Sequence, residues 1–468
     1  MLGRIVGVVL ACALGGGVGP AGDKLSKEHR EAFVALAEQA RDAKPEKRRS
    51  AVRALAEFGG EEAWRLVFAA LEDTDSSVGD AAQRAIGRLG DPKLALELCG
   101  PAGLGSKEER VQLRAAEALG RLQVGVDAER LARELSPRGG ERDRLLVWSI
   151  ERLAAGGKLL GDAGKAAREL EKLERSDGDK GLAGAALCAL AELAPARALD
   201  LARDSLRDRS SEKRCAAALV LGRLKPPDAL GEALRLASDA DPRVRMRGIE
   251  CLDAIGTRAS MLAIVGRLAN EPRLRVRWRA VDLLQRASGL KHRLDPRPWK
   301  LWAEELPEGG VLKRGMSPEA AAKAEAQGAT RASGFAGLSI LSDHVAFLFD
   351  FSGSMWTPMA DGRIPKDIVD AKLRLALEAL PESTEFNLIP FTNVPIPYAP
   401  EARTAKRGEV QKALEWFSKC REKGRGNFYD AARIAMVDPA IDTIVVLTDG
   451  VPTGGLHSEM DLIVALLA

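Results

Sequence analysis

The stretch 350–354, Asp-Phe-Ser-Gly-Ser, carries one carboxylate and two hydroxyls at alternate positions. It follows the apolar run 345–349, which is typical of a buried strand in a parallel sheet. A second apolar run, 443–448, ends in Asp449-Gly450. Open α/β sheets bind ligands at the carboxyl edge of their strands, so we expect Asp449 to lie beside the first loop. Oxygen-only ligands of this kind suit Mg²⁺, Ca²⁺ or Mn²⁺.

This arrangement resembles the metal-ion-dependent adhesion site of the von Willebrand factor type A domain. The family pattern is Asp-x-Ser-x-Ser, then a Thr on a distant loop, then an Asp after a later buried strand. Here Asp350, Ser352 and Ser354 match the first part, and Asp449 matches the last. The resemblance implies that these residues hold a divalent cation, directly or through water. It also implies that an acidic side chain of a protein partner completes the coordination.

The Thr position of this pattern is occupied by a glycine. Its loop is matched by residues 424–431, Gly-Arg-Gly-Asn-Phe-Tyr-Asp-Ala, where relatives often read Gly-Gly-Thr-Asn before Tyr-Asp-Ala. On that match Gly426 offers no side-chain oxygen. The amide carbonyl of Asn427, or a water molecule, is the candidate replacement. A site that is weakened or has lost its cation is the alternative.

Expected strands and helices alternate in the region 343–468. The run 386–391 is a further expected strand, and the stretches 366–380 and 407–419 are expected helices. Such alternation predicts a parallel, doubly wound sheet. The sequence stops inside the apolar stretch 462–468, whereas members of the family continue with more strand–helix units. We therefore expect an incomplete domain with an open sheet edge.

The region 25–305 repeats itself. Apolar anchor residues, each followed three positions later by a second apolar or small residue, recur at Leu55, Ile86, Leu119, Ile150, Leu187, Leu221, Leu252 and Leu284. Three of these copies read apolar-Gly-Arg-Leu. A period in the low thirties is typical of stacked helix pairs, which bury their apolar faces only against the next pair. The pattern resembles a HEAT-repeat solenoid, and an irregular helical bundle is the alternative.

The segment after the repeats no longer follows their pattern. Trp299 and Trp302 lie three apart, so they share one helical face and predict a helix that caps the array. Residues 306–342 are expected to form a linker with one short helix, and an edge strand is expected near 338–341. The predicted organisation is thus a helical solenoid, a linker and an α/β domain.

Length and charge exclude some partners. A chain of 468 residues implies two or more domains. Lys plus Arg total 70 and Asp plus Glu 67, a balance that gives no general reason to expect nucleic acid. The arginines at 273, 275, 277 and 279 lie two apart and do not form one helical face. We therefore expect protein partners and no nucleic acid.

The N-terminus predicts export. Arg4, the apolar stretch 5–18 and the small residues that follow describe a secretory signal covering residues 1–21. Its removal would leave no membrane span, and the chain is expected in the periplasm, the cell envelope or the medium. An uncleaved anchor and a lipid attached at Cys12 are less favoured alternatives. The other five cysteines are widely spread, and Cys188, Cys215 and Cys251 are expected to act as small buried hydrophobes. Export would permit disulfides, but nothing in the sequence demands them.

The residues that would indicate catalysis are missing. None of the pairs that can be formed from His29, His292, His344 and His457 has metal-ligand spacing, and His457 is expected on an exposed loop. The sequence contains neither Gly-x-Ser-x-Gly nor a phosphate loop. The whole chain resembles a bacterial exported adhesion protein or scaffold without enzymatic activity. Two alternatives remain: a structural scaffold with a metal-free site, and an accessory subunit of an enzyme complex.

Overall fold

The computed structural model describes residues 27–312 and 334–467, except for 89, 137–138, 177, 336–337 and 449. The expected signal at 1–21, the linker helix and Asp449 lie outside the described residues. The described part divides into two compact units, and the boundary along the chain falls within helix α10 (Ala163–Glu174). Within it, no helix combines the length and the apolar character that crossing a membrane requires.

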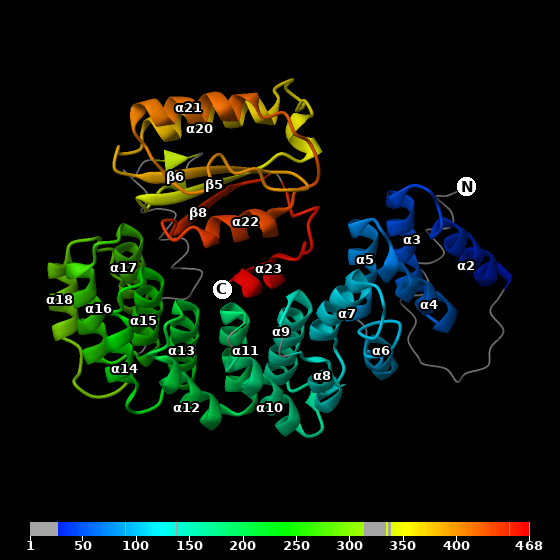
Figure 1. Ribbon diagram of the computed structural model, residues 1–468, viewed down its shortest axis with the longest axis horizontal. Helices are drawn as coiled ribbons and strands as arrows, with labels where there is room; N and C mark the ends of the chain where they lie inside the picture. Colours follow the sequence, from blue (N-terminus) through cyan, green and yellow to red (C-terminus); the bar gives the residue numbers. More distant parts are fainter. Residues whose placement is uncertain are drawn as a thin grey trace. The chain divides into compact units, whose positions relative to one another are not determined.

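The first unit is a stack of short helices (Figure 1). In chain order these are α2 (Lys27–Gln39), α3 (Pro45–Phe58), α4 (Glu61–Ala69), η1 (Ala70–Glu72), α5 (Ser76–Gly87), α6 (Pro92–Leu98), α7 (Glu109–Arg121), α8 (Ala128–Glu134) and α9 (Glu141–Ala155). Helix α3 packs on α5, α5 on α7 and α7 on α9. Two short parallel strands, β1 (Val126–Asp127) and β2 (Leu159–Leu160), join neighbouring loops.

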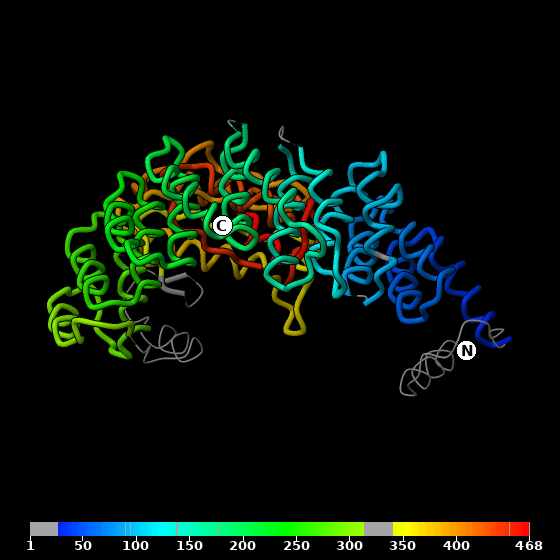
Figure 2. The backbone as a smooth tube through the Cα atoms, turned by 90° about the horizontal axis from the view of Figure 1, so that it is seen from below, coloured from blue at the N-terminus to red at the C-terminus, as the bar shows by residue number. Residues whose placement is uncertain are grey.

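The second unit begins with the same arrangement. Its helices are α11 (Lys180–Leu193), α12 (Pro195–Ser205), α13 (Ser211–Leu224), α14 (Ala229–Leu236), α15 (Pro242–Ile255), α16 (Arg258–Asn270), α17 (Leu274–Ser288) and α18 (Pro296–Glu304). Helix α11 packs on α13, α13 on α15 and α15 on α17. In Figure 2 the green part of the tube runs back and forth through these successive pairs. The repeated helix pairs that the sequence predicts are confirmed in both units.

The glycine of the apolar-Gly-Arg-Leu motif lies where one repeat meets the next. A Cβ on Gly87 would lie 2.7 Å from the Cβ of Arg121. A Cβ on Gly120 would lie 2.5 Å from the Trp148 ring. Real Cβ atoms do not approach other atoms so closely, so only glycine allows this helix spacing. In these two copies the glycine therefore sets the distance between successive repeats, whereas a Cβ on Gly222 of the third copy would lie at an ordinary 3.4 Å from Cys251 Cα.

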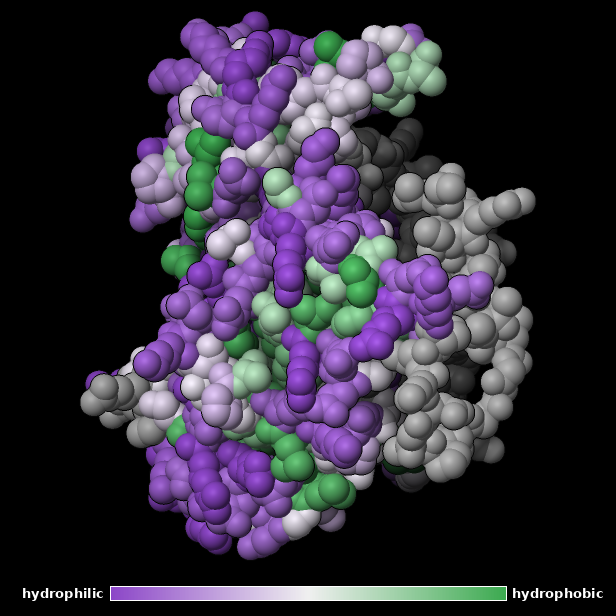
Figure 3. Space-filling model, turned by 90° about the vertical axis from the view of Figure 1, so that its right-hand side faces the viewer, coloured by the Kyte–Doolittle hydropathy of each residue, from purple (hydrophilic) through white to green (hydrophobic). Residues whose placement is uncertain are grey.

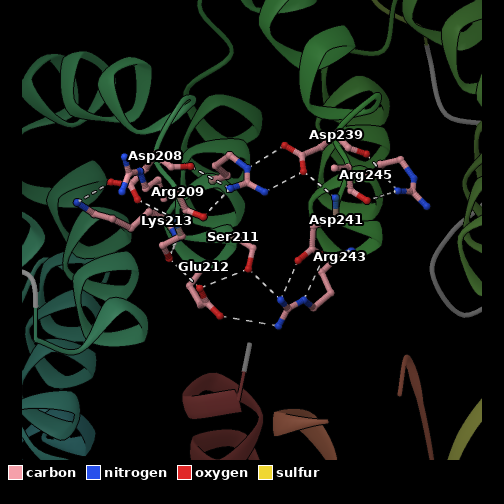
Figure 4. A network of polar contacts seen from close by, with 12 residues as sticks. Asp208, Arg209, Ser211, Glu212, Lys213, Asp239, Asp241, Arg243 and Arg245 are labelled. Atoms are coloured by element: carbon pink, nitrogen blue, oxygen red, sulfur yellow. Dashed lines mark hydrogen bonds and ion pairs between the residues drawn. The ribbon is translucent and has the colours of Figure 1, made fainter. Parts of the chain in front are cut away.

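Arginines early in helices α3, α13 and α15 connect each repeat to the next. The pairs are Arg48–Asp73, Arg214–Asp239 and Arg245–Glu271, with nitrogen–oxygen distances of 2.7 to 2.9 Å. Each guanidinium also donates to two backbone carbonyls of its own loop. Figure 4 shows this network around Asp239 and Arg245. These planar, bidentate contacts satisfy loop backbone groups and carboxylates together.

Helix α18 ends the helical array as expected. Trp299 is fully buried, and its Nε1 donates to the carbonyl of Arg293 at 2.7 Å. Its ring meets the ring of Trp302 edge-on at 6.4 Å. Helix α18 packs on α16, and the backbone N–H of Leu312 donates to the carbonyl of Gly256. The apolar side of the last repeat is thereby covered.

The burial expected for the cysteines is confirmed for Cys251, whereas Cys188 and Cys215 are partly exposed. All five described cysteines are free thiols, and Cys251 and Cys420 are buried. Burial raises the pKa of Cys251 to about 12 and that of Cys99 to about 11. Because the thiolate is the reactive form, the raised pKa lowers the reactivity of these two thiols at neutral pH.

The C-terminal domain is built on a mainly parallel sheet. Its strands are β5 (His344–Asp350), β6 (Glu385–Phe391), β7 (Arg403–Thr404) and β8 (Thr443–Leu447), in the order β7-β6-β5-β8. Strand β5 pairs in parallel with β6 and β8, and β7 is antiparallel to β6. A short antiparallel pair, β3 (Gly334–Phe335) and β4 (Leu338–Ser339), precedes the sheet.

Helices cover both faces of this sheet. Helices α20 (Pro365–Glu378) and α21 (Arg407–Lys419) pack with Phe347 and Phe349 on one face. Helix α22 (Phe428–Val437) packs with Ala346 and Leu348 on the other, and α23 (Met460–Leu467) follows it. Figure 1 shows α20 and α21 on one side of the strands and α22 on the other. The doubly wound fold that the sequence predicts is confirmed.

Candidate metal site at the carboxyl edge of the sheet

Asp350 is the last residue of β5 and is only 4% exposed. Its Oδ1 accepts the backbone N–H of Ser352 at 2.8 Å, which closes a tight turn. The N–H of Phe351 donates to the carbonyl of Phe391 at the end of β6. The turn then enters the short helix η2 (Gly353–Trp356). The carboxylate is therefore held at the carboxyl edge of the sheet, as the sequence predicts for this strand.

The hydroxyls of Ser352 and Ser354 lie 3.0 Å apart. Adjacent oxygens around an octahedral Mg²⁺, with metal–oxygen distances of about 2.1 Å, are separated by about 3.0 Å. The separation therefore suits two neighbouring ligands of one hard cation, besides the hydrogen bond that the pair makes. Ser352 is buried, whereas Ser354 is exposed, so a cation here would be reachable from solvent.

Thr448 joins the end of β8 to this turn. Its hydroxyl lies 2.8 Å from Oδ2 of Asp350 and 2.9 Å from the carbonyl of Gly450, and it accepts the N–H of Gly450. Both oxygens of Asp350 thus accept hydrogen bonds, which suits a carboxylate that reaches a cation through water. Asp449 itself lies outside the described residues. The contact of Thr448 nonetheless brings its loop against Asp350.

Gly426 lies directly beside the carboxylate of Asp350. A Cβ on Gly426 would lie 3.1 Å from each oxygen of that carboxylate. The N–H of Gly426 donates to the hydroxyl of Thr453 at 3.0 Å, and the N–H of Thr453 donates back to the Gly426 carbonyl. A side chain at 426 would therefore point into the site, and glycine leaves that place without an oxygen.

Asn427, the candidate replacement ligand, caps helix α22. The residue is 3% exposed, and its Oδ1 accepts the N–H of Asp430. Its Nδ2 donates to Asp430 Oδ2 at 2.7 Å and to the Asn393 carbonyl at 2.9 Å. The contacts of the Asn427 side chain are therefore those of a helix N-cap.

A buried lysine supports the turn from behind. Lys366 is 1% exposed and pairs with Asp370. Its Nζ lies 5.1 Å from the ring centroid of Phe351, 5.9 Å from that of Trp356 and 4.5 Å from that of Phe417. These cation–π contacts offset part of the cost of burying the ammonium. They also fix the two aromatic residues that flank the serines.

Three of these residues, Lys366, Thr448 and Thr453, were missed in the sequence. The sequence analysis treated Thr448 only as the last residue of an apolar strand. A hydroxyl beside Asp449 at a strand end could have indicated that Thr448 belongs to the site. His457 was expected on an exposed loop, and this was wrong. It is 3% exposed and meets the ring of Tyr429 edge-on at 4.7 Å, because its loop folds back onto α22.

One arginine of the last repeat, Arg279, is engaged in ion pairs within the fold. Arg279 pairs with Glu250 at 2.8 Å and with Asp282 at 2.6 Å. Arg279 is thus held by acidic neighbours of its own helix and of α15. On the face shown in Figure 3, hydrophilic side chains surround small, separate groups of hydrophobic ones.

Comparisons with known proteins give the same two parts. Residues 33–100 and 199–285 match HEAT repeats, and residues 343–465 match the von Willebrand factor type A domain. A search of curated proteins found no match.

Solved structures resemble the chain only loosely. Human deoxyhypusine hydroxylase is 20% identical over 55% of this chain and 96% of its own, with a TM-score of 0.24. The CpcE–CpcF complex of phycocyanin lyase from Nostoc sp. PCC7120 is 19% identical over 62% and 97%, with a TM-score of 0.25. Kap121p bound to Pho4p is 16% identical over 55% and 33%, with a TM-score of 0.36. These likenesses carry no argument about function. The chain is a HEAT-repeat protein with a C-terminal von Willebrand factor type A domain.

Proposed function

We propose that this protein is a non-enzymatic scaffold whose C-terminal domain binds a protein carboxylate through a divalent cation. Asp350, Ser352 and Ser354 would hold the cation, and Asp449 is the expected fourth group. Mg²⁺ is the first candidate, with Ca²⁺ and Mn²⁺ as alternatives. When bound, such an ion offers an open or water-filled position that a partner's acidic side chain can take.

The observation that carries the proposal is the meeting of two loops at one sheet edge. Thr448 contacts the carboxylate of Asp350, and the serine hydroxyls lie 3.0 Å apart beside it. The chain's own groups perform simple tasks there. Ser352 N–H and the Thr448 hydroxyl orient the carboxylate, while Lys366 and its aromatic neighbours hold the turn. The exposed Ser354 leaves one side open for a partner.

The HEAT repeats would contribute a second protein contact. Stacked helix pairs offer an extended surface of many similar helices, which suits contact with another protein. We also propose that the chain is exported, because residues 1–21 have the pattern of a secretory signal. Acidic protein partners, and not nucleic acid, are therefore expected in an extracytoplasmic compartment.

Titration calorimetry tests the cation. The full chain is freed of metal by a chelator and titrated with MgCl₂, MnCl₂ and CaCl₂. We expect saturable binding of at least one ion to the wild type and none to Asp350→Ala. Asp361→Asn, an exposed carboxylate paired with Arg363 in the same domain, is the matched control and should bind as the wild type does. Absence of binding for all three ions would remove the cation mechanism.

The competing function is a structural scaffold whose cation site is empty, and Gly426 favours it. Gly426→Thr distinguishes the two, because the new hydroxyl would stand beside Asp350, where the family carries one. A cation-binding site should gain affinity, whereas a site without cation function should show no binding in either protein. The close approach at 3.1 Å requires a shift of a few tenths of an ångström, so thermal unfolding must confirm that the variant folds.

A further inference from the structure

A second cluster of metal-ligating side chains lies at the opposite end of the same strands. Strand β5 begins at His344, which pairs in register with Glu385 at the start of β6. The next residue, Val345, pairs with Thr443 at the start of β8. Asp343 and Asp442 immediately precede these two strands and join His344 at the amino edge of the sheet. Six residues of strand separate this edge from Asp350, about 20 Å at about 3.3 Å per residue.

The imidazole of His344 is surrounded by carboxylates. Its Nδ1 lies 2.7 Å from Asp343 Oδ1 and 4.0 Å from Asp442 Oδ2. Its Nε2 lies 3.5 Å from Glu385 Oε2. Asp343, His344 and Asp442 each offer one ligand atom, and these three atoms lie within 4.8 Å of one another. The side chain of His344 is 17% exposed, so the cluster is largely shielded but still reachable from solvent.

One carboxylate oxygen in this cluster accepts no hydrogen bond within the described part of the chain. Asp442 Oδ1 accepts the hydroxyls of Ser342 and Thr443, at 2.5 and 2.9 Å, which fixes the orientation of the carboxylate. Its Oδ2 is buried, on a side chain that is only 10% exposed, and yet it accepts no hydrogen bond from any described residue. A buried carboxylate oxygen without a partner is costly and therefore uncommon. At 4.0 Å, Nδ1 of His344 is too far away to serve it.

The distances leave room for an ion between these groups. Zinc–ligand distances of about 2.0 Å place two tetrahedral ligands about 3.3 Å apart. The two distances from Nδ1, 2.7 Å and 4.0 Å, lie on either side of that value. Each needs to change by about 0.6 to 0.7 Å to reach it, which is within the reach of side-chain rotations. The imidazole proton must then sit on Nε2, which lies 3.5 Å from Glu385 Oε2. A small shortening of that distance would give the outer hydrogen bond that is typical of a metal-bound histidine.

We propose that Asp343, His344 and Asp442 form a site for a divalent transition metal, with Zn²⁺ as its test ion. An imidazole nitrogen combined with carboxylates suits Zn²⁺ and its neighbours, whereas oxygen-only sets suit Mg²⁺ and Ca²⁺. Water completes the coordination. The ion ties β5 to β8 at the amino edge, so this site is structural and independent of the cation site at Asp350.

Titration of the metal-free full chain with ZnCl₂ tests the proposal. We expect one site and a rise in the thermal unfolding midpoint. His344→Gln removes the nitrogen ligand. Asp442→Asn keeps an acceptor for Ser342 and Thr443 but replaces the unpartnered charged oxygen. Each variant should bind Zn²⁺ at least tenfold more weakly, since even outer-shell changes cost about 10- to 100-fold.

Two controls separate this site from others. Asp350→Ala and Asp361→Asn should bind Zn²⁺ as the wild type does, because neither residue belongs to the cluster. Circular dichroism must show that both cluster variants are folded. Absence of zinc binding by the wild type, or equal binding by the folded His344→Gln and Asp442→Asn variants, would overturn the proposal.

Discussion

Removal of the Arg245 side chain should be far more damaging than removal of an exposed arginine. The side chain of Arg245 is 9% exposed and that of Glu271 is fully buried. Two hydrogen bonds of 2.9 and 2.7 Å join them. Arg245→Met would leave a buried carboxylate without its main partner. Losing one member of a buried pair costs about 3 to 5 kcal/mol.

The local contacts place the expected loss near the lower end of that range. Glu271 keeps an ion pair with Arg267 at 3.1 Å, and its Oε1 still accepts the N–H of Arg273 at 3.0 Å. We therefore expect a loss of about 3 kcal/mol. Such a loss raises the equilibrium constant for local unfolding of this repeat about a hundredfold. Hydrogen exchange measured by mass spectrometry should show the effect in α15, α16 and α17, because repeats depend mainly on their neighbours.

Two further variants make the test specific. Arg297→Met removes an exposed partner of Asp295, with side chains 87% and 44% exposed, and should have little effect on stability. The double variant Arg245→Met with Glu271→Leu removes both buried charges and should recover most of the loss. The reasoning fails if Arg245→Met is no more destabilising than Arg297→Met, or if the double variant is worse than the single one.

Two other perturbations follow from the helical repeats. Gly120→Ala places a Cβ 2.5 Å from the Trp148 ring, so we expect overpacking to cost about 1 to 3 kcal/mol in urea unfolding, and a neutral effect would contradict the spacing role. Hydrogen bonds from Arg133 and Lys165 hold the pKa of Glu129 at about 2, below its usual 4.5. Because the folded-state pKa is lowered, this contribution is complete above about pH 4.5 and is lost as the pH falls toward 2. The stability difference between wild type and Glu129→Gln should therefore shrink over that range, and also in high salt, since the pair is exposed.

The sequence predicted the repeats well because their signal is local and recurs. Apolar anchors about 32 residues apart, three of them followed directly by Gly-Arg-Leu, are visible without any knowledge of pairing. The arginine connectors were missed because they join residues 25 or 26 positions apart, as Arg214 and Asp239 do. Their spacing also recurs, so a search for arginine–carboxylate pairs at that separation would have found them.

The residues at the two ends of the sheet differ in how far their grouping can be predicted from the sequence. Asp350, Ser352 and Ser354 are neighbours in the chain, so their shared place at the carboxyl edge could be predicted. Asp442 lies about 100 residues from His344, and only the register of β5 against β8 brings them together. A search for histidine pairs or local ligand spacing cannot find such a cluster.

Strand β8 pairs with β5 alone among the described strands, yet both of its ends are fastened. At one end the hydroxyl of Thr448 donates to the carboxylate of Asp350. At the other end the hydroxyl of Ser342 donates to the carboxylate of Asp442. A slip of one residue would break both bonds and exchange the two faces of the strand. Sheet margins with free backbone groups invite pairing with other molecules and misaligned pairing within their own. Here a hydrogen bond at each end fixes the register of β8 against β5, so the strand itself can remain apolar.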